Sequence, residues 1–173
     1  AALEHGAAPG AVARALAAFR PLAHRLETVA TIDGVEYVDD SKATNPHATL
    51  SALRGRRDVV LIAGGRSKGN DLSELRAAVP PVLAVVALGE AAAEIARVFD
   101  GLVPVDVVAG MEAAVAAARG RAIPGGSVLL SPACASLDMY TSYAARGDHF
   151  ACCVRDLAGS GPMGEGGDGG GDT

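Results

Sequence analysis

The polar segment from Asp39 to Pro46 holds the residue types in this chain that are best suited to chemistry. It reads Asp-Asp-Ser-Lys-Ala-Thr-Asn-Pro and places two carboxylates, a lysine, two hydroxyls and an amide close together. A largely apolar run (residues 35–38) precedes it and predicts a strand, and the apolar spacing after it predicts a helix. A turn requires only one or two such polar residues. Ligands of open α/β sheets bind where a strand turns into a helix, so this segment predicts a binding or catalytic site.

Two further polar segments follow apolar runs in the same way. Residues 64–71 (Gly-Gly-Arg-Ser-Lys-Gly-Asn-Asp) come after Val59–Ala63, and residues 131–138 (Ser-Pro-Ala-Cys-Ala-Ser-Leu-Asp) come after a strand expected at 128–131. The carboxyl ends of parallel strands meet at one edge of a sheet. We therefore expect all three segments to converge on one crevice.

Two residues in these loops predict sites for anions. Lys68 lies between glycines just before an expected helix at 72–79, where free N–H groups and the helix dipole favour negative charge. Ser136 and the amides near it open the last expected helix and form a second candidate. Two anion sites on one edge suit a small dicarboxylate or a ligand that bears phosphate. The plainer alternatives are a solvated lysine in a turn and a simple helix cap, and Arg25 is either a surface residue or a phosphate clamp.

The remaining reactive residue types predict no metal site. His5, His47 and His149 lack the spacing of metal ligands, and the three cysteines form neither a disulfide framework nor a zinc site. Cys134 lies beside the expected crevice, where we interpret it as a packing residue. The chain also lacks the G-x-x-x-x-G-K-[ST] motif, so by itself it should hold a nucleoside triphosphate poorly.

The elements that position these loops indicate an α/β fold. Apolar runs alternate with helical patterns, which is typical of a parallel sheet with helices on both faces. Asp33-Gly34 predicts an N-terminal β-hairpin. The fold class is thus a Rossmann-like, mostly parallel sheet. Strands are expected at 26–32, 35–39, 59–63, 82–88, 103–108 and 128–131, and helices at 9–20, 72–79, 90–99, 111–118 and 140–157, besides the one after Pro46.

Composition narrows the class of protein. The chain has 173 residues, of which 50% are apolar and only 3% aromatic, which suits one domain with tight packing of helices on a sheet. The net charge is −5 and there is no basic stripe, so nucleic-acid binding is not expected. No apolar run is long enough for a membrane span, and no signal-peptide pattern is present; we expect a soluble, cytoplasmic monomer. The glycine-rich residues 159–173 are expected to be disordered.

The three loop segments resemble the D-glutamate-adding members of the ATP-dependent Mur ligase family. Arg146-Gly147-Asp148-His149-Phe150 and His24-Arg25-Leu26-Glu27 also match their pattern. The resemblance extends over residues 1–158 and covers the C-terminal third of such an enzyme. It implies that residues 1–20 belong to the last helix of a central ATPase domain and that residues 21–158 form the D-glutamate-binding domain. The central and N-terminal domains lie outside the resemblance.

The resemblance also implies a reaction in peptidoglycan precursor synthesis. ATP with Mg²⁺ phosphorylates the carboxylate of UDP-N-acetylmuramoyl-L-alanine, and the amine of D-glutamate attacks the acyl phosphate. Because the missing domains supply most of this chemistry, we expect this chain alone to be inactive and to hold no cofactor tightly. Alternatives are the domain of another Mur-type amino-acid ligase, a non-catalytic Rossmann-like anion-binding module and an interaction domain whose N-terminal helix docks a partner.

Residue roles follow from the same resemblance. Lys42 would be catalytic and face the reacting phosphate. The remaining residues implied for ligand binding are Thr44 and Lys68 for the α-carboxylate of D-glutamate, Ser136 and the backbone of Leu137 and Tyr143 for its side-chain carboxylate, Arg25 for an ATP phosphate, and Asp40 for the ribose. Tyr143 stands where a phenylalanine is common in the family.

Overall fold

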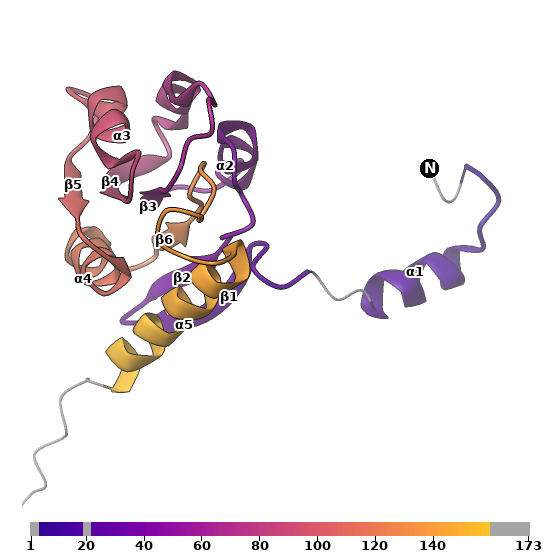
Figure 1. Cartoon of the computed structure of the whole chain (residues 1–173). Helices are drawn as coiled ribbons and strands as arrows, with labels where there is room; N and C mark the ends of the chain where they lie inside the picture. The colour runs from indigo at the N-terminus through magenta and orange to yellow at the C-terminus, as the bar shows by residue number, and fades with distance from the viewer. Residues whose placement is uncertain (1–3, 19–21, 160–173) are drawn as a thin grey trace, which may run out of the picture.

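The chain folds into a layered α/β structure, seen here in a computed structural model that describes residues 4–18 and 22–159 (Figure 1). Its elements in chain order are α1 (Pro9–Ala18), β1 (Glu27–Ile32), β2 (Val35–Asp39), α2 (Pro46–Ala52), β3 (Val59–Gly64), the 3₁₀-helix η1 (Leu72–Ala78), β4 (Val82–Leu88), α3 (Ala92–Phe99), β5 (Val105–Val108), α4 (Met111–Arg121), β6 (Ser127–Leu130) and α5 (Tyr143–Gly159).

Six strands form one sheet in the order β1-β2-β6-β3-β4-β5. β1 runs antiparallel to β2, and all other neighbouring strands are parallel. The hairpin turns at Asp33 and Gly34, whose φ angles of 53° and 77° lie in the left-handed region that a two-residue hairpin turn requires. The expected hairpin and the mostly parallel sheet are therefore confirmed.

Helices cover both faces of the sheet, as expected (Figure 1). α4 and α5 pack on one face, whereas α2, η1 and α3 lie on the other. The alternation of side chains along β3 shows how each face is filled: Leu61 and Ala63 join the core under α3, and Val60 and Ile62 join the core under α4 and α5. All four are fully buried, which explains why this strand is apolar throughout.

The helices expected at 90–99 and 111–118 span Ala92–Phe99 and Met111–Arg121, and two further helices also differ from expectation. The segment after Asp71 is a 3₁₀-helix, and Pro80 and Pro81 follow it closely, so there is no room for a longer α-helix. The last helix begins at Tyr143 rather than at residue 140. The backbone N–H of Tyr140 donates to the carbonyl of Ser136 instead, at 2.8 Å, which closes a turn before the helix.

Some expectations fall on residues outside the described ranges. These are residues 19 and 20 at the end of the first expected helix and the glycine-rich segment 160–173. Gly159, which was expected to open that segment, is the last residue of α5.

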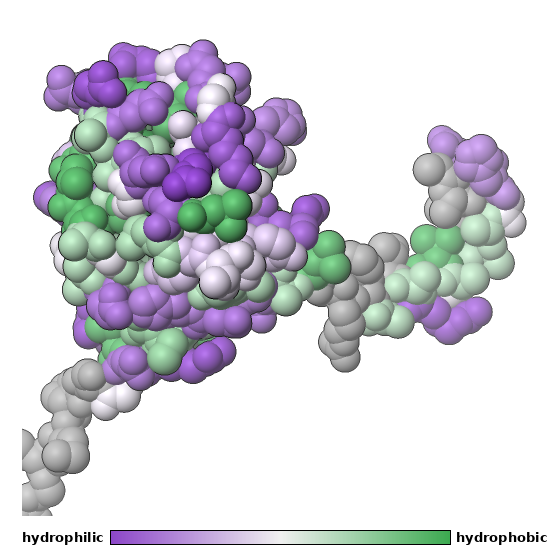
Figure 2. All heavy atoms as spheres, in the orientation of Figure 1, coloured by the Kyte–Doolittle hydropathy of each residue, from purple (hydrophilic) through white to green (hydrophobic). Residues whose placement is uncertain are grey.

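Within residues 4–18 and 22–159, no helix is both long and apolar enough to cross a bilayer. Figure 2 shows hydrophilic and hydrophobic residues intermingled over the face in view.

Candidate functional site

The strand order brings three polar loops together at the carboxyl edge of the sheet. β2, β6 and β3 are neighbours, and the loops that follow them span residues 40–45 (the β2 loop), 131–142 (the β6 loop) and 65–71 (the β3 loop). The N–H of Ala133 donates to the carbonyl of Ala43 at 3.0 Å, which joins the β6 loop to the β2 loop. Arg66 and Ala135 exchange two backbone hydrogen bonds of 2.8 and 3.0 Å, which join the β6 loop to the β3 loop. The predicted convergence of the three segments is confirmed.

The buried side chain of Arg146 connects the same part of the sheet edge. Arg146 on α5 is only 2% exposed. Its Nε donates to the Ser41 hydroxyl at 3.0 Å and its Nη2 to the Ser41 carbonyl at 2.8 Å, while Nη1 donates to the carbonyls of Cys134 at 3.1 Å and Gly64 at 3.4 Å. Burial lowers the pKa of the guanidinium to about 10, so it stays charged at neutral pH. One side chain thus links the β2 loop and the β6 loop to the end of β3.

The role of Arg146 was not predicted from the sequence, although a signal was present. Arg146 lies on the face of α5 that also carries Phe150 and Val154, both fully buried. A charged side chain on an apolar helix face must find polar partners, because burial of an unpaired charge is very costly. That position therefore marks Arg146 as part of a buried polar network.

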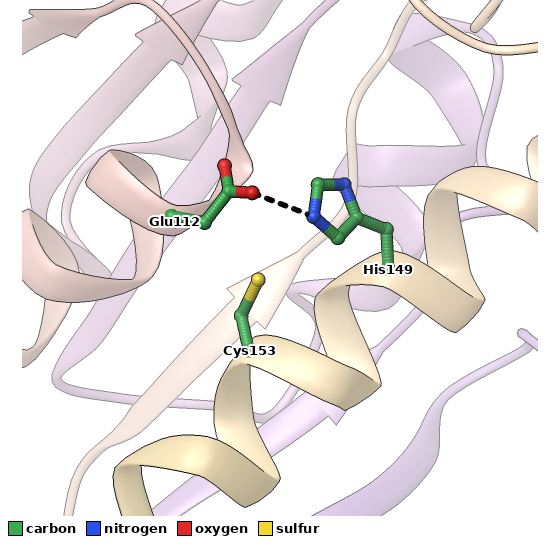
Figure 3. A group of neighbouring side chains, drawn as sticks. All are labelled: Glu112, His149 and Cys153. Carbon is green, nitrogen blue, oxygen red and sulfur yellow. Dashed lines mark hydrogen bonds and ion pairs between the residues drawn. The ribbon is translucent and has the colours of Figure 1, made fainter.

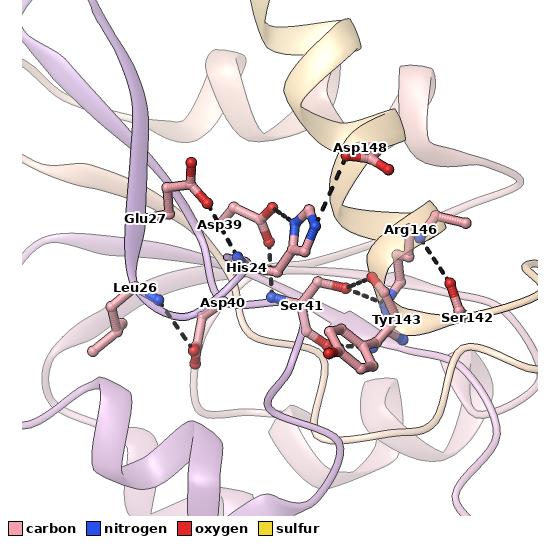
Figure 4. Close-up of polar contacts among 11 residues, drawn as sticks. His24, Leu26, Glu27, Asp39, Asp40, Ser41, Ser142, Tyr143, Arg146 and Asp148 are labelled. Atoms are coloured by element: carbon pink, nitrogen blue, oxygen red, sulfur yellow. Dashed lines mark hydrogen bonds and ion pairs between the residues drawn. The ribbon is translucent and has the colours of Figure 1, made fainter. Parts of the chain in front are cut away.

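His24 and Asp39, the last residue of β2, form a pair that packs against α5 (Figure 4). Asp39 Oδ2 lies 2.7 Å from His24 Nδ1, and Asp39 Oδ1 accepts a hydrogen bond from the Ser41 N–H at 2.8 Å. A Cβ at Gly147 would collide with both the His24 ring and the Asp39 carboxylate. Glycine at this position therefore lets α5 approach the pair closely, and His24 Nε2 then lies 3.8 Å from Asp148.

The carboxylate of Asp40 is also buried and held by hydrogen bonds. Its Oδ2 accepts from the Ser131 hydroxyl at 2.9 Å and its Oδ1 from the Leu26 N–H at 3.3 Å. Burial raises the pKa of Asp40 above its ordinary value, and these two hydrogen bonds and the positive charge of Arg25 oppose that shift. The network fixes the carboxylate at the edge of the sheet.

Arg25, Asp40 and Lys42 line one cavity of about 250 Å³. Its other walls come from the β1 end, the β2 loop and α2, at Leu26, Ala43, His47, Ala48, Ser51 and Ala52. The structure therefore brings together the two residues expected to contact ATP and the expected catalytic lysine. Thr44, Lys68, Ser136, Leu137 and Tyr143 do not line this cavity.

Lys42 rests against Tyr143 at the start of α5 (Figure 4 shows the tyrosine). Its Nζ lies 3.0 Å from the Tyr143 hydroxyl and 4.3 Å from the centre of the ring. The Ser41 hydroxyl donates to the Tyr143 carbonyl at 2.7 Å, so the first residue of α5 is tied to the β2 loop twice. This arrangement holds the Lys42 ammonium group at the carboxyl edge of the sheet.

The five residues expected to bind D-glutamate lie on the same edge, in the three loops and at the start of α5. Asn70 of the β3 loop donates to the carbonyl of Thr44 in the β2 loop at 3.4 Å. Lys68 is exposed and has a φ of 52°, whereas Ser136 is 3% exposed and Leu137 is 49% exposed. Lys68 and Lys42 are the only lysines in the whole sequence, and both stand in these loops.

Lys68 and Ser136 were expected to use the N-termini of helices, and the structure corrects this. The carboxylate of Asp71 caps η1 by accepting from the Ser73 N–H at 2.9 Å, so a negative group already occupies that terminus. Ser136 lies in a turn of the β6 loop, and Ser142 caps α5 through the Ala145 N–H at 3.0 Å. Neither residue therefore draws on a free helix end.

Free backbone donors nevertheless remain at this edge. Within the described part of the chain, no acceptor receives a hydrogen bond from the backbone N–H of Ser136, Leu137 or Tyr143. Such N–H groups, together with the Ser136 hydroxyl, are suited to bind a carboxylate or phosphate oxygen. These N–H groups are therefore candidate donors to an anion at this edge.

Comparison with known protein families agrees with this arrangement. The family model described as the Mur ligase, glutamate ligase domain, matches residues 24–134, which include the β2 and β3 loops and the start of the β6 loop. The chain belongs to this family. This Mur ligase domain is 51% identical over 154 residues to the UDP-N-acetylmuramoylalanine–D-glutamate ligase of Frankia casuarinae, covering 87% of this chain and 33% of the relative.

A second relative supports the same assignment, and a solved structure shares the fold. The enzyme with that name from Corynebacterium jeikeium is 49% identical over 157 residues, covering 84% of this chain and 31% of the relative. The Mur ligase domain thus spans about a third of the length of these relatives. The crystal structure of UDP-N-acetylmuramate-alanine ligase from Thermotoga maritima matches with a TM-score of 0.61 at 14% identity, covering 90% of this chain and 35% of that one. At such low identity, the likeness shows the shared fold.

Proposed function

We propose that this Mur ligase domain binds D-glutamate within a longer, ATP-dependent ligase that joins D-glutamate to UDP-N-acetylmuramoyl-L-alanine. The observation that carries the proposal is the convergence of the β2, β3 and β6 loops, with both lysines of the chain, at one edge of the sheet. The names of the most similar relatives support the choice of D-glutamate over another amino acid. The reaction belongs to peptidoglycan precursor synthesis in the cytoplasm.

The proposed reaction forms an amide in two steps. ATP, assisted by Mg²⁺, transfers its terminal phosphoryl group to the alanyl carboxylate, and the amine of D-glutamate then attacks the acyl phosphate and expels phosphate. Lys42 would lie against the phosphoryl group that is transferred, where an ammonium group offsets developing negative charge. Its half-buried position on the Tyr143 ring supports this role, because the packing limits where Nζ can lie.

The acceptor amino acid would be held at both carboxylates. Thr44 and Lys68 would bind the α-carboxylate, and Ser136 with the N–H groups of Leu137 and Tyr143 would bind the side-chain carboxylate. The free backbone donors in the β6 loop and at the start of α5 support the second half of this pocket. Two separated anion sites select a dicarboxylate by its length.

The cavity beside Asp40 would receive part of the nucleotide. Arg25 would contact a phosphate, and the Asp40 carboxylate would accept a hydrogen bond from a ribose hydroxyl. The fixed orientation of that carboxylate by Ser131 and Leu26 supports this assignment, because a preorganised acceptor loses little entropy on binding.

This chain alone would show no ATPase or ligase turnover, since the domain that holds the phosphates and Mg²⁺ would lie elsewhere in the longer enzyme. It would act as a monomer. Turnover by the isolated chain would contradict the assignment of phosphate and Mg²⁺ binding to another domain.

An NMR titration of the labelled chain with D-glutamate tests the proposal, with L-glutamate as the matched ligand control. We expect D-glutamate to shift amide signals at Thr44, Lys68 and Ser136 more strongly than L-glutamate does. Lys68→Met should weaken the response, whereas Arg155→Met, an exposed change on the outer part of α5, should not. Equal responses to the two enantiomers, or shifts confined to other parts of the sheet, would contradict the assigned pocket.

A further inference from the structure

Three side chains with metal-binding atoms meet between α4 and α5 (Figure 3). They are Glu112 near the start of α4 and His149 and Cys153 on α5, and their ligand atoms all lie within 4.8 Å of one another. Glu112 Oε1 is 3.0 Å from His149 Nε2. Figure 3 shows the carboxylate directed at the imidazole and the sulfur atom directed toward the space between them.

The fold fixes this arrangement through two helices. His149 and Cys153 are four residues apart on α5, so they lie on one face of that helix. α4 packs against this face and supplies the carboxylate from its first turn. The sulfur end is buried, His149 is partly exposed and Glu112 is exposed, so an ion from solution can reach the group.

The surroundings of the three side chains also suit a cation. A cavity of about 200 Å³ lies beside them and is lined by Glu112, Cys153 and Asp156 among others. Among residues 4–18 and 22–159, neither a lysine nor an arginine lines it. The other ring nitrogen of the histidine, Nδ1, is 2.9 Å from the Tyr140 hydroxyl. Such an outer partner orients a metal-binding histidine and fixes which nitrogen faces the metal.

We propose that Glu112, His149 and Cys153 form a Zn²⁺ site, with a water molecule as the fourth ligand. Imidazole nitrogen, thiolate sulfur and carboxylate oxygen are the three ligand types that zinc combines in proteins, usually in tetrahedral sites. Sulfur and nitrogen ligands disfavour Mg²⁺ and Ca²⁺, which prefer oxygen. The bound ion would link α4 to α5 and replace the present contact between Glu112 and His149.

Binding must displace the proton of the thiol. Burial, followed by the negative charge of Glu112, raises the pKa of Cys153 to about 11, so the metal-free thiol is protonated at neutral pH. A divalent cation reverses the local charge and stabilises the thiolate. None of the three ligands lies in the loops that carry Lys42 and Lys68. The zinc proposal therefore does not depend on the D-glutamate proposal.

Titration of the reduced chain with Co²⁺, used as a spectroscopic substitute for Zn²⁺, tests the site. We expect a thiolate-to-cobalt absorption band that Zn²⁺ abolishes by displacement and that excess Mg²⁺ leaves unchanged. Cys153→Ser should remove the band. Cys152→Ser is the matched control, because the neighbouring thiol is exposed and outside the cluster, and it should keep the band.

A second variant distinguishes loss of a metal ligand from a folding defect in Cys153→Ser. Glu112→Gln alters an exposed side chain, so it should fold normally, and it should raise the Co²⁺ concentration at which half of the band appears. Absence of the band in the unmodified chain would overturn the proposal. So would a band that survives Cys153→Ser, or a Co²⁺ affinity that is unchanged in Glu112→Gln.

Discussion

Replacing Arg146 with methionine should loosen all three loops of the candidate site without unfolding the chain. Methionine fills most of the buried volume but donates no hydrogen bonds. The Ser41 carbonyl at 2.8 Å and the Cys134 carbonyl at 3.1 Å then lose their donor in a buried setting. The Gly64 carbonyl, at 3.4 Å, loses a weaker contact.

The size of the effect follows from these contacts. A buried acceptor left without a donor costs about 1–3 kcal/mol, so two of them cost about 4 kcal/mol. Release of a buried cation offsets part of this, which leaves a loss of roughly 3 kcal/mol in the free energy of unfolding. For a domain of this size, each kcal/mol lowers Tm by about 2–4 °C, so the expected fall is about 6–12 °C.

Urea unfolding followed by circular dichroism measures the loss, with Arg155→Met on the exposed side of the same helix as control. Hydrogen exchange supplies a local readout, because the amides of Arg66 and Ala135 bond the β3 loop to the β6 loop. Both should exchange faster in Arg146→Met. A loss below about 1 kcal/mol with unchanged exchange at these amides would refute the view that the guanidinium holds the loops together.

Two further predictions concern the polar contacts at the same edge. Gly147→Ala should destabilise the fold despite the better helix propensity of alanine, because its Cβ would collide with His24 and Asp39; Gly120→Ala on α4 meets no atom within 4 Å and should instead be neutral or stabilising by up to about 1 kcal/mol in thermal melts. Equal effects of the two changes would contradict the close approach of α5. Asp40→Asn should keep or increase stability at neutral pH. Because burial raises the Asp40 pKa in the folded state, the stability that the wild-type carboxyl contributes is fully present below its ordinary pKa of 3.8 and is lost as the pH rises through the folded value. Urea unfolding of both proteins from acid to neutral pH checks this sign, and an advantage for aspartate that grows with pH would show it to be wrong.

Features set by local sequence were predictable. The Asp33-Gly34 turn specifies its hairpin through left-handed φ angles that few other residue pairs adopt. β4 was placed correctly, from Val82 to Leu88, because a strand covered on both faces is apolar throughout. The three polar loops could also be located, since each directly follows such a run.

Features set by distant parts of the chain were not predictable. No local signal shows that β6 inserts between β2 and β3, yet this order determines which loops touch. Ser136 was expected to open the last helix, but its carbonyl instead accepts two N–H groups in a turn. The spacing of His149 and Cys153 on one helix face was visible, but the third member of their cluster, Glu112, comes from another helix.

The position of β6 has a consequence for synthesis on the ribosome. A nascent chain that ends before Ser127 can form the β1–β2 hairpin and the β3–β4–β5 sheet, but not the contact between them, because β6 lies in the middle. Each part then exposes an unpaired strand edge, which is a template for pairing with other chains. Once Ser127–Leu130 emerges, β6 can pair with β2 and with β3 and so cover both edges. Arg146 is made later and then forms its hydrogen bonds to the loops. We therefore expect the nascent domain to stay vulnerable to aggregation until β6 is made, because no intermediate without β6 brings Lys42 and Lys68 to a common edge.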